Sequence, residues 1–321
     1  MRMRVVATAL CLAVGSVACV ADAGPEGEVA DDQPVASVAE SVTPAASAIK
    51  TVFVIVMENK NWWQIKGSSS APYINSLLPQ SSYADNYNNP PGTHPSEGNY
   101  LWMEAGDSLG ISNDNPPAQN HQSTPLHLAR LLDAQGISWK SYQEDIADNK
   151  CPLTDVGKYA PKHNPFVFFD DMTGTNDANN AYCIAHNRPY TELANDLVNN
   201  TVARYNFITP NQCNDMHDFC SFDQVRQGDD WLRREIPRIM ASRAYQEGGA
   251  IIITFDEAWL FDGPIGMVVL SPLAKGGGYH NNIKYDHSSL LRTLQEIFAV
   301  TPLLRNAATA TSLSDFFTTY P

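Results

Sequence analysis

The 321-residue sequence is short of basic residues, since 21 Lys and Arg stand against 35 Asp and Glu and the formal charge is −14. An acidic surface repels nucleic acid and anionic membranes, so neither is a natural non-specific partner. No apolar run after the N-terminal region is long enough to cross a membrane, and we expect no transmembrane segment. The chain also lacks internal repeats. One large α/β domain or two small ones fit this length.

The N-terminus has the pattern of an export signal, in which the basic residues "MRMR" precede the short apolar run "VVATALCLAVGSVA". The residues "ADA" at 21–23 are typical of signal-peptidase cleavage, whereas "SVAC", ending at Cys19, is similar to a degenerate lipoprotein box. We expect a signal peptide over residues 1–18, or up to 23, and a secreted, periplasmic or lipid-anchored protein. Residues 19–48 are acidic and lack a periodic apolar face, which predicts a disordered tether before a folded domain at 49–321.

Cysteine is scarce: there are six residues, of which two lie in the signal region. In an exported protein the remaining four favour two disulfides, and three pairings are open. Cys213 and Cys220 are close enough in sequence to close a local loop, which would leave Cys151 with Cys183. A zinc site is the alternative, but these cysteines include no C-x-x-C pair.

Three continuous apolar runs, 51–57, 249–255 and 265–271, are typical of strands buried on both faces. Helical patterns lie between and after them, in "APYINSLLP", "TPLHLARLLDAQG", "YTELANDLVNN", "GDDWLRREIPRIMASRAYQ" (with Pro237 as a candidate kink) and "DHSSLLRTLQEIFAV". Strands that alternate with helices predict an α/β fold, a three-layer α/β/α sandwich with a mostly parallel central sheet. The four later cysteines fall in a loop-rich segment, about 145–220, that we expect to be an insertion over one sheet edge.

Polar residues directly follow two of these strands. Glu58 and Asn59 follow the first, and Asp256 and Glu257 follow the strand at 249–255. The carboxyl ends of parallel strands open into one crevice, so these side chains are expected to share a site. Like charges placed close together are costly unless a cation neutralises them, and hard oxygen ligands suit a divalent metal. Acidic strand ends are also common without any function, so it is the coincidence of both pairs that favours a metal site.

The segment "THPSEGNY" places Ser96 after a proline and before a predicted helix. A serine in this position is commonly a helix N-cap. The same position also binds phosphate, because the first N–H groups of a helix and its dipole attract anions. Ser96 is then a candidate nucleophile toward phosphorus, and Asn99, on the same helical face, is a candidate for holding a phosphoryl oxygen. The absence of G-x-S-x-G argues against a hydrolase of the nucleophile-elbow type.

Several separated motifs occur in the order "VIVMEN", "APYINSLL", "THPSEGNY", "KHNPFVFF", "ITPNQCNDMHD", "IIITFDEA" and "DHSSLLRTLQEIF". In that order they resemble the phosphoesterase family with the alkaline-phosphatase-like fold, which includes secreted bacterial acid phosphatases and phospholipases C. The resemblance covers most of residues 50 to 300 and implies that Ser96 is the nucleophile of a phosphoserine intermediate. The metal or active-site ligands that it implies are Glu58, Asn59, Ser96, Asp256 and Glu257. The substrate contacts or proton donors that it implies are His94, Lys162, His163, His217 and His287.

The resemblance therefore implies an exported, metal-dependent phosphomonoesterase similar to acid phosphatases, in which His217 or His287 gives the leaving alcohol its proton. Two-metal relatives end the late strand in Asp-His, whereas Glu257 follows Asp256 here, so we expect one divalent cation. Histidines that become cationic as pH falls favour an acid optimum. Two alternatives stay open: a phospholipase C-type phosphodiesterase, and a non-catalytic, surface-tethered binding protein on the same fold. The aromatic residues of "NWW" (61–63) either stack on an apolar part of the substrate or form a packed cluster.

Overall fold

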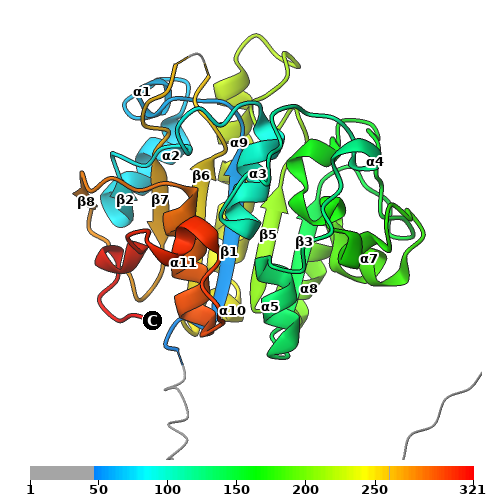
Figure 1. The fold of residues 1–321 in the computed structure, drawn as a ribbon. Coiled ribbons are helices and arrows are strands. Elements are labelled where there is room, and N and C mark those ends of the chain that lie inside the picture. Colours follow the sequence, from blue (N-terminus) through cyan, green and yellow to red (C-terminus); the bar gives the residue numbers. More distant parts are fainter. Residues whose placement is uncertain (1–46, 260) are drawn as a thin grey trace, which may run out of the picture. The chain divides into compact units, whose positions relative to one another are not determined.

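Residues 47–259 and 261–321 are described by a computed structural model, and the expected signal peptide, the Cys19 anchor and residues 19–46 of the tether lie outside the described residues. The described residues form an eight-stranded sheet with helices on both faces (Figure 1). The strand order is β4-β3-β5-β1-β6-β7-β2-β8. The strands are β1 Thr51–Met57, β2 Ser82–Ala84, β3 Trp139–Gln143, β4 Asn187–Pro189, β5 Tyr205–Thr209, β6 Gly249–Phe255, β7 Met267–Leu270 and β8 Tyr279–Asn281.

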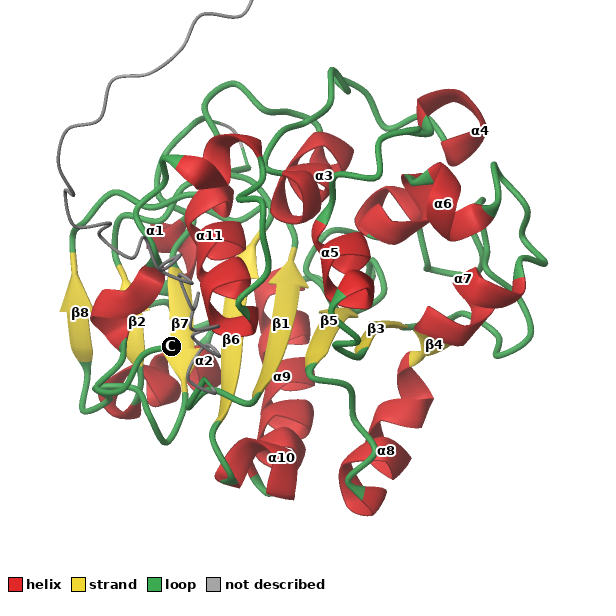
Figure 2. Cartoon of the chain, turned by 60° about the horizontal axis from the view of Figure 1, so that its bottom comes forward, coloured by secondary structure: helices red, strands yellow, loops and turns green. Residues whose placement is uncertain are grey.

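The sheet is mostly parallel. Among the described strands only β7 runs antiparallel, to its neighbours β6 and β2, while every other pair is parallel (Figure 2). The predicted α/β class and three-layer sandwich are therefore confirmed. Because all the described strands except β7 share one direction, their carboxyl ends lie along one edge of the sheet, where ligands bind in open α/β folds.

The helices form two layers. α3, α5 and α11 pack against one another on one face of the sheet, whereas α2, α8 and α10 each pack against α9 on the other (Figures 1 and 2). Their bounds are α1 Trp62–Ile65, α2 Pro72–Leu77, α3 Ser96–Ala105, α4 Pro117–Asn120, α5 Leu128–Ala134, α6 Asp170–Thr173, α7 Ala181–His186, α8 Leu193–Asn199, α9 Gln224–Met240, α10 Arg243–Gln246 and α11 His287–Phe298. α9 runs through Pro237, and the predicted fourth helical segment is two helices, α9 and α10.

A search of the described helices finds none with both the length and the apolar character needed to cross a bilayer.

The most apolar strands lie at the centre of the sheet. β1 and β6 occupy the predicted ranges residue for residue, and every residue in both is buried. This agreement follows from their continuous apolar runs, which fit only a strand that is covered on both faces. The run at 265–271 is shortened to β7 at Met267–Leu270.

The segment 145–220 is more than an insertion over one sheet edge, because it supplies β5, which pairs with β1 on one side and β3 on the other. β5 was missed because its short run "YNFIT" mixes polar with apolar residues. Asn206 Nδ2 donates to the carbonyl oxygens of Val52 and Ala203, at 3.2 and 2.7 Å. Such partners make a buried amide N–H group tolerable in a strand, and the sequence does not show them.

Two disulfides, Cys151–Cys183 and Cys213–Cys220, join the four later cysteines. This is the pairing that local loop closure favoured, and the zinc alternative is wrong because both pairs of sulfur atoms are bonded to each other. The Cys213–Cys220 disulfide closes the loop that carries Asp215 and His217. Two disulfides are typical of a protein that folds in an oxidising compartment.

Candidate active site

The pairing of β1 with β6 brings two polar strand ends together. Met57 is in register with Phe255, so Glu58 and Asp256 follow neighbouring positions of adjacent parallel strands. The Asp256 N–H donates to Met57 O at 3.0 Å, and the Asn59 N–H donates to Asp256 Oδ1 at 3.1 Å. The predicted convergence of the two carboxylate pairs at the carboxyl edge is therefore present.

A third carboxylate, Asp215, joins this group from the loop after β5. Its carbonyl accepts the Glu58 N–H at 2.8 Å, and the Asp215 side chain is fully buried. Asp215 was not among the predicted site residues, although it lies within "ITPNQCNDMHD". The signal that marks it is its place after a strand neighbouring β1, and that signal depends on recognising β5.

Ser96 is the first residue of α3, and Pro95 occupies the N-cap position. The interpretation of Ser96 as a helix cap is therefore wrong. The Ser96 hydroxyl instead donates to Glu58 Oε2 at 3.1 Å and is almost completely buried. Ser96 thus faces the carboxylates while it stands at the positive end of a ten-residue helix, where anions are favoured.

Two histidines face Glu58 from the loop-rich segment. His163, in the 3-10 turn Pro161–His163, places Nε2 at 3.2 Å from Glu58 Oε1 and Nδ1 at 3.4 Å from Asp215 Oδ2. His217 Nδ1 lies 2.8 Å from Asp218 Oδ1. One ligand atom from each of Glu58, His163 and His217 lies within 4.8 Å of the others, a spacing that one metal ion can bridge.

The carboxyl groups are held in an environment that opposes their charge. Burial, followed by the charges of Asp256 and Asp215, raises the pKa of Glu58 well above its usual value. Burial also raises the pKa of Asp215 and of Asp256. For Glu257, burial and the charge of Asp256 raise the pKa to about 9. These groups can ionise together only if a cation compensates them.

Buried atoms left without partners show that a cation fits here. Asn59 Oδ1 and Asp256 Oδ2 find no hydrogen-bond partner among the described residues. Asp215 Oδ2 and His163 Nε2 lie near His163 Nδ1 and Glu58 Oε1, but make no hydrogen bond of suitable geometry. Buried polar atoms are normally satisfied, and oxygen and imidazole ligands bind divalent metals. Burial, then the charge of Lys162, lowers the pKa of His163, so its ring stays neutral and keeps a lone pair for a metal.

Glu257 is held by three neighbours and is not one of the residues Glu58, His163 and His217 that could share a metal ion. Asn59 Nδ2 donates to its Oε1 at 2.7 Å, Asn99 Nδ2 donates to its Oε2 at 3.0 Å, and His94 Nδ1 lies 2.7 Å from the same Oε2. Asn99 Nδ2 also donates to Thr93 O at 2.9 Å, so both of its N–H groups are engaged. Asn99 therefore positions Glu257 in this structure, and the phosphoryl contact expected of it has no free donor.

His287 lies behind the site. It is fully buried, with Nε2 at 2.5 Å from Asp256 O and Nδ1 at 2.9 Å from the Tyr87 hydroxyl. Burial lowers its pKa to about 4. Both ring nitrogens are engaged, so His287 supports the backbone at Asp256, and the proton donor expected from the sequence is better placed at His217.

The neutral rings of His163 and His287 also remove part of the argument for an acid optimum, which rested on cationic histidines.

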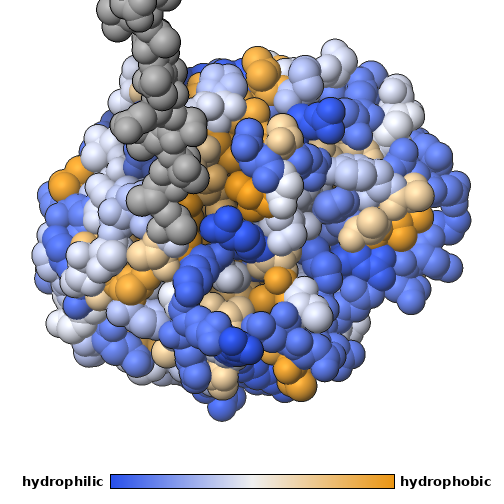
Figure 3. Space-filling view, turned by 90° about the horizontal axis from the view of Figure 1, so that it is seen from below, coloured by the Kyte–Doolittle hydropathy of each residue, from blue (hydrophilic) through white to orange (hydrophobic). Residues whose placement is uncertain are grey.

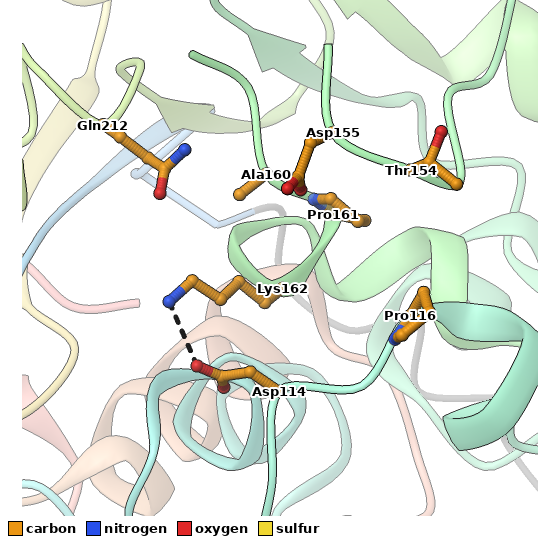
Figure 4. A pocket seen from close by; sticks show the side chains of 8 residues that line it. All are labelled: Asp114, Pro116, Thr154, Asp155, Ala160, Pro161, Lys162 and Gln212. Atoms are coloured by element: carbon orange, nitrogen blue, oxygen red, sulfur yellow. Dashed lines mark hydrogen bonds and ion pairs between the residues drawn. The ribbon is translucent and has the colours of Figure 1, made fainter. Parts of the chain in front are cut away.

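A cavity of about 500 Å³ is lined in part by Asp114, Lys162 and Gln212 (Figure 4). Lys162 points across it, with Nζ 3.0 Å from Asp114 Oδ2 and 3.4 Å from His217 Nε2. Burial works against the charge of Lys162, but the attraction of Asp114 and Glu58 outweighs it and raises the pKa of the ammonium group. A cationic Lys162 in this cavity is an attractive charge for an anion.

Comparison with known proteins agrees with this geometry. Residues 68–301 match the Phosphoesterase family. The chain belongs to the phosphoesterase family. It is 30% identical over 285 residues to a phosphatidylinositol-3-phosphatase of Mycobacterium tuberculosis, a match that covers 85% of each chain. It is 29% identical over 275 residues to a probable acid phosphatase of Kluyveromyces lactis, covering 80% of this chain and 60% of that one.

Solved structures support the same fold. A protein in the alkaline phosphatase superfamily from Vibrio parahaemolyticus superposes with a TM-score of 0.54 at 11% identity, covering 83% of this chain and 71% of the other. This phosphoesterase is a hydrolase of phosphoric esters. The family match begins after β1 and ends beyond α11, so it includes Ser96, Asp215 and Asp256.

Proposed function

We propose that the chain is an exported, metal-dependent phosphomonoesterase that forms a phosphoserine at Ser96. The observation that carries the proposal is the hydrogen bond from the Ser96 hydroxyl to Glu58, inside a group of buried carboxylates at the N-terminus of α3. A helix N-cap does not need this arrangement, whereas a nucleophile toward phosphorus does. The export-like N-terminus and the two disulfides support the proposed location.

The side chains support a two-step reaction. Ser96 Oγ attacks phosphorus and passes its proton to Glu58, the Oγ–P bond forms, and the bond to the leaving oxygen breaks. His217, at the mouth of the site beside Lys162, supplies the proton that the leaving alcohol needs. A water then attacks phosphorus and gives one proton to His217. The Ser96 Oγ–P bond breaks, Ser96 Oγ takes its proton back from Glu58, and phosphate leaves.

One divalent cation would be held by Glu58 with Asn59, Ser96 and Asp256, as the sequence implies, which leaves His217 free to donate a proton. A cation held instead by Glu58, His163 and His217 would require another proton donor. When bound, it would neutralise phosphoryl charge and lower the pKa of the serine hydroxyl. Lys162 and the N-terminus of α3 orient the anionic group from opposite ends of the site.

The test uses p-nitrophenyl phosphate and its bis-ester with the purified protein, with and without chelator. We expect monoester turnover that chelation suppresses and that Ser96→Ala lowers by roughly 10³-fold or more. Ser76→Ala, an exposed serine of α2, is the control. Acid-quenched protein should carry phosphate on Ser96 by peptide mass spectrometry. Turnover of the diester alone would favour the phospholipase C-type alternative, and binding without turnover would favour the non-catalytic one.

A further inference from the structure

A second, apolar recess is lined by residues that follow the carboxylates in the chain after β1 and after β6. After β1, the chain supplies Glu58 to the site and then Asn61, Trp63 and Gln64 to the recess. After β6, it supplies Asp256 to the site, and the recess lining that follows comprises Trp259, Phe261, Asp262, Gly263 and Pro264. The recess has a volume of about 340 Å³. The phosphoester site and the recess are therefore built by the chain segments that follow the same two strands, with Trp63 and Gln64 in α1.

Hydrogen bonds between the two loops hold the recess in shape. The Trp259 N–H donates to Asn61 Oδ1 at 3.2 Å, and Asn61 Nδ2 donates to Phe261 O at 3.2 Å. Lys60 Nζ lies 4.7 Å from the centre of the Trp259 ring and donates to Met216 O at 2.9 Å. The Trp259 ring is thus fixed between the backbone of the site and the recess. A pocket whose walls are already held in place loses less entropy when it takes a ligand.

One imidazole ring separates the recess from the carboxylates. His94 contacts Glu257 Oε2 through Nδ1 at 2.7 Å and Asp262 Oδ1 through Nε2 at 3.0 Å. Glu257 belongs to the site, and Asp262 lines the recess. An ester whose phosphate lies at Ser96 can therefore extend its organic part past His94 toward the recess.

The aromatic side chains of the recess are exposed to solvent rather than packed in the hydrophobic core. Trp62 is 6% exposed and packs in the core, whereas the adjacent Trp63 is 76% exposed. Trp259 and Phe261 are 43% and 80% exposed. The two interpretations of "NWW" thus apply to different residues, with Trp62 in the packed cluster and Trp63 open to a ligand. The face seen from below, at the amino ends of the strands, is mixed, with hydrophilic surface and several separate hydrophobic patches (Figure 3).

We propose that this recess binds an aromatic ring of the substrate's alcohol, so that the protein prefers phosphate monoesters of aromatic alcohols. This inference rests on the proposed function. Flat indole and phenyl walls favour a ring in stacked or edge-on contact. The volume suits a ring with a short linker. The Asp262 carboxylate at the lining disfavours a second anionic group on the substrate.

The test compares phenethyl, cyclohexylethyl and ethyl phosphates, whose leaving alcohols have similar acidity, so differences report binding rather than intrinsic reactivity. We expect kcat/KM for phenethyl phosphate to exceed that for ethyl phosphate roughly tenfold and that for cyclohexylethyl phosphate roughly threefold. Trp63→Ala and Trp259→Ala should each lower the phenethyl-to-ethyl ratio by roughly threefold or more. Phe222→Ala removes a fully exposed aromatic residue outside the recess and should leave the ratio unchanged.

Binding of phosphonates that cannot be hydrolysed separates this inference from the proposed function. Phenylpropyl phosphonate should bind roughly tenfold more tightly than propyl phosphonate by calorimetry, and Trp63→Ala should reduce that preference. If neither ester is hydrolysed while the binding preference holds, the proposed function fails and the recess assignment stands. Equal binding of the two phosphonates, or equal kcat/KM for the phenethyl and cyclohexylethyl esters, would overturn the aromatic subsite.

Discussion

Ser96 and Glu58 are joined by a hydrogen bond of 3.1 Å, although 38 positions separate them in the chain. Glu58 Oε1 also accepts the Tyr100 hydroxyl at 2.6 Å, from the next turn of the same helix α3. The end of β1 and the first turns of α3 are therefore held together through a single buried carboxylate. Anything that changes Glu58 should act on the nucleophile directly and on the fold only secondarily.

Glu58→Gln should separate activity from stability. Its volume is nearly conserved, but the carboxylate that receives the Ser96 proton is lost, so kcat on p-nitrophenyl phosphate should fall by roughly 10²- to 10⁴-fold. The chelator-treated variant should melt no lower than the wild type, because a carboxyl group that burial and its acidic neighbours oppose has been removed. Tyr100→Phe, which removes only the second hydrogen bond, is the control. Wild-type turnover in Glu58→Gln would contradict the role assigned to Glu58.

Removing the Cys213–Cys220 disulfide should mainly lower activity, whereas removing the Cys151–Cys183 disulfide should mainly lower stability. The double change Cys213→Ser with Cys220→Ser releases the loop that carries Asp215 and His217, so it should lower kcat strongly. The double change Cys151→Ser with Cys183→Ser should affect stability more, by about 2–4 kcal/mol, because it opens a loop of larger sequence separation, 32 against 7 positions.

Chemical denaturation and p-nitrophenyl phosphate kinetics on both double variants measure this contrast. If the two variants lost activity and stability in the same proportion, the Cys213–Cys220 disulfide would have no special role in positioning the site.

Gly228→Ala should destabilise the protein, although the same change at an exposed helix position is favourable by about 1 kcal/mol. A Cβ at Gly228 in α9 would lie 2.9 Å from Asn214 O and closer still to the Met216 side chain. These residues flank Asp215, so the loop has to shift, at a cost of about 1–3 kcal/mol. We expect a lower melting temperature together with a lower kcat. Arg233→Ala, on the exposed side of α9, controls for composition, and a stabilised Gly228→Ala would contradict the close packing.

Glu104 should make stability depend on pH. It is fully buried in α3, where Oε1 accepts the Tyr205 hydroxyl at 2.7 Å, and burial raises its pKa to about 8. The folded state holds this proton after the unfolded chain has released it near its ordinary pKa of 4.5. The free energy of unfolding therefore falls as pH rises between these two values, by up to roughly 5 kcal/mol from this group.

Urea denaturation at pH 5 and pH 8 measures this effect. Glu104→Gln should lose less stability than the wild type over that interval, because the titrating group is gone. Glu247→Gln, at an exposed carboxyl group, should follow the wild type. Equal losses in Glu104→Gln and wild type would mean that Glu104 is ionised in the folded protein at neutral pH.

The sequence by itself determined the class of fold and the first residues of the site. β1 and β6 are continuous apolar runs, and only a strand covered on both faces accommodates such a run. The residues that follow them, Glu58 and Asp256, had to meet at one edge because parallel strands end on the same side. These relations depend on chain direction and hydrophobic pattern, which are local properties.

The tertiary structure alone decided which side chains complete the site and what each of them does. Asp215 joined it because β5, a short strand with a polar residue, lies beside β1, and no local pattern reveals that neighbour. The role of Ser96 as something other than a helix cap follows from its contact with Glu58 Oε2. The role of His287 as something other than a proton donor follows from its contact with Asp256 O. Contacts between residues far apart in sequence depend on packing and burial, and these exist only once the chain has folded.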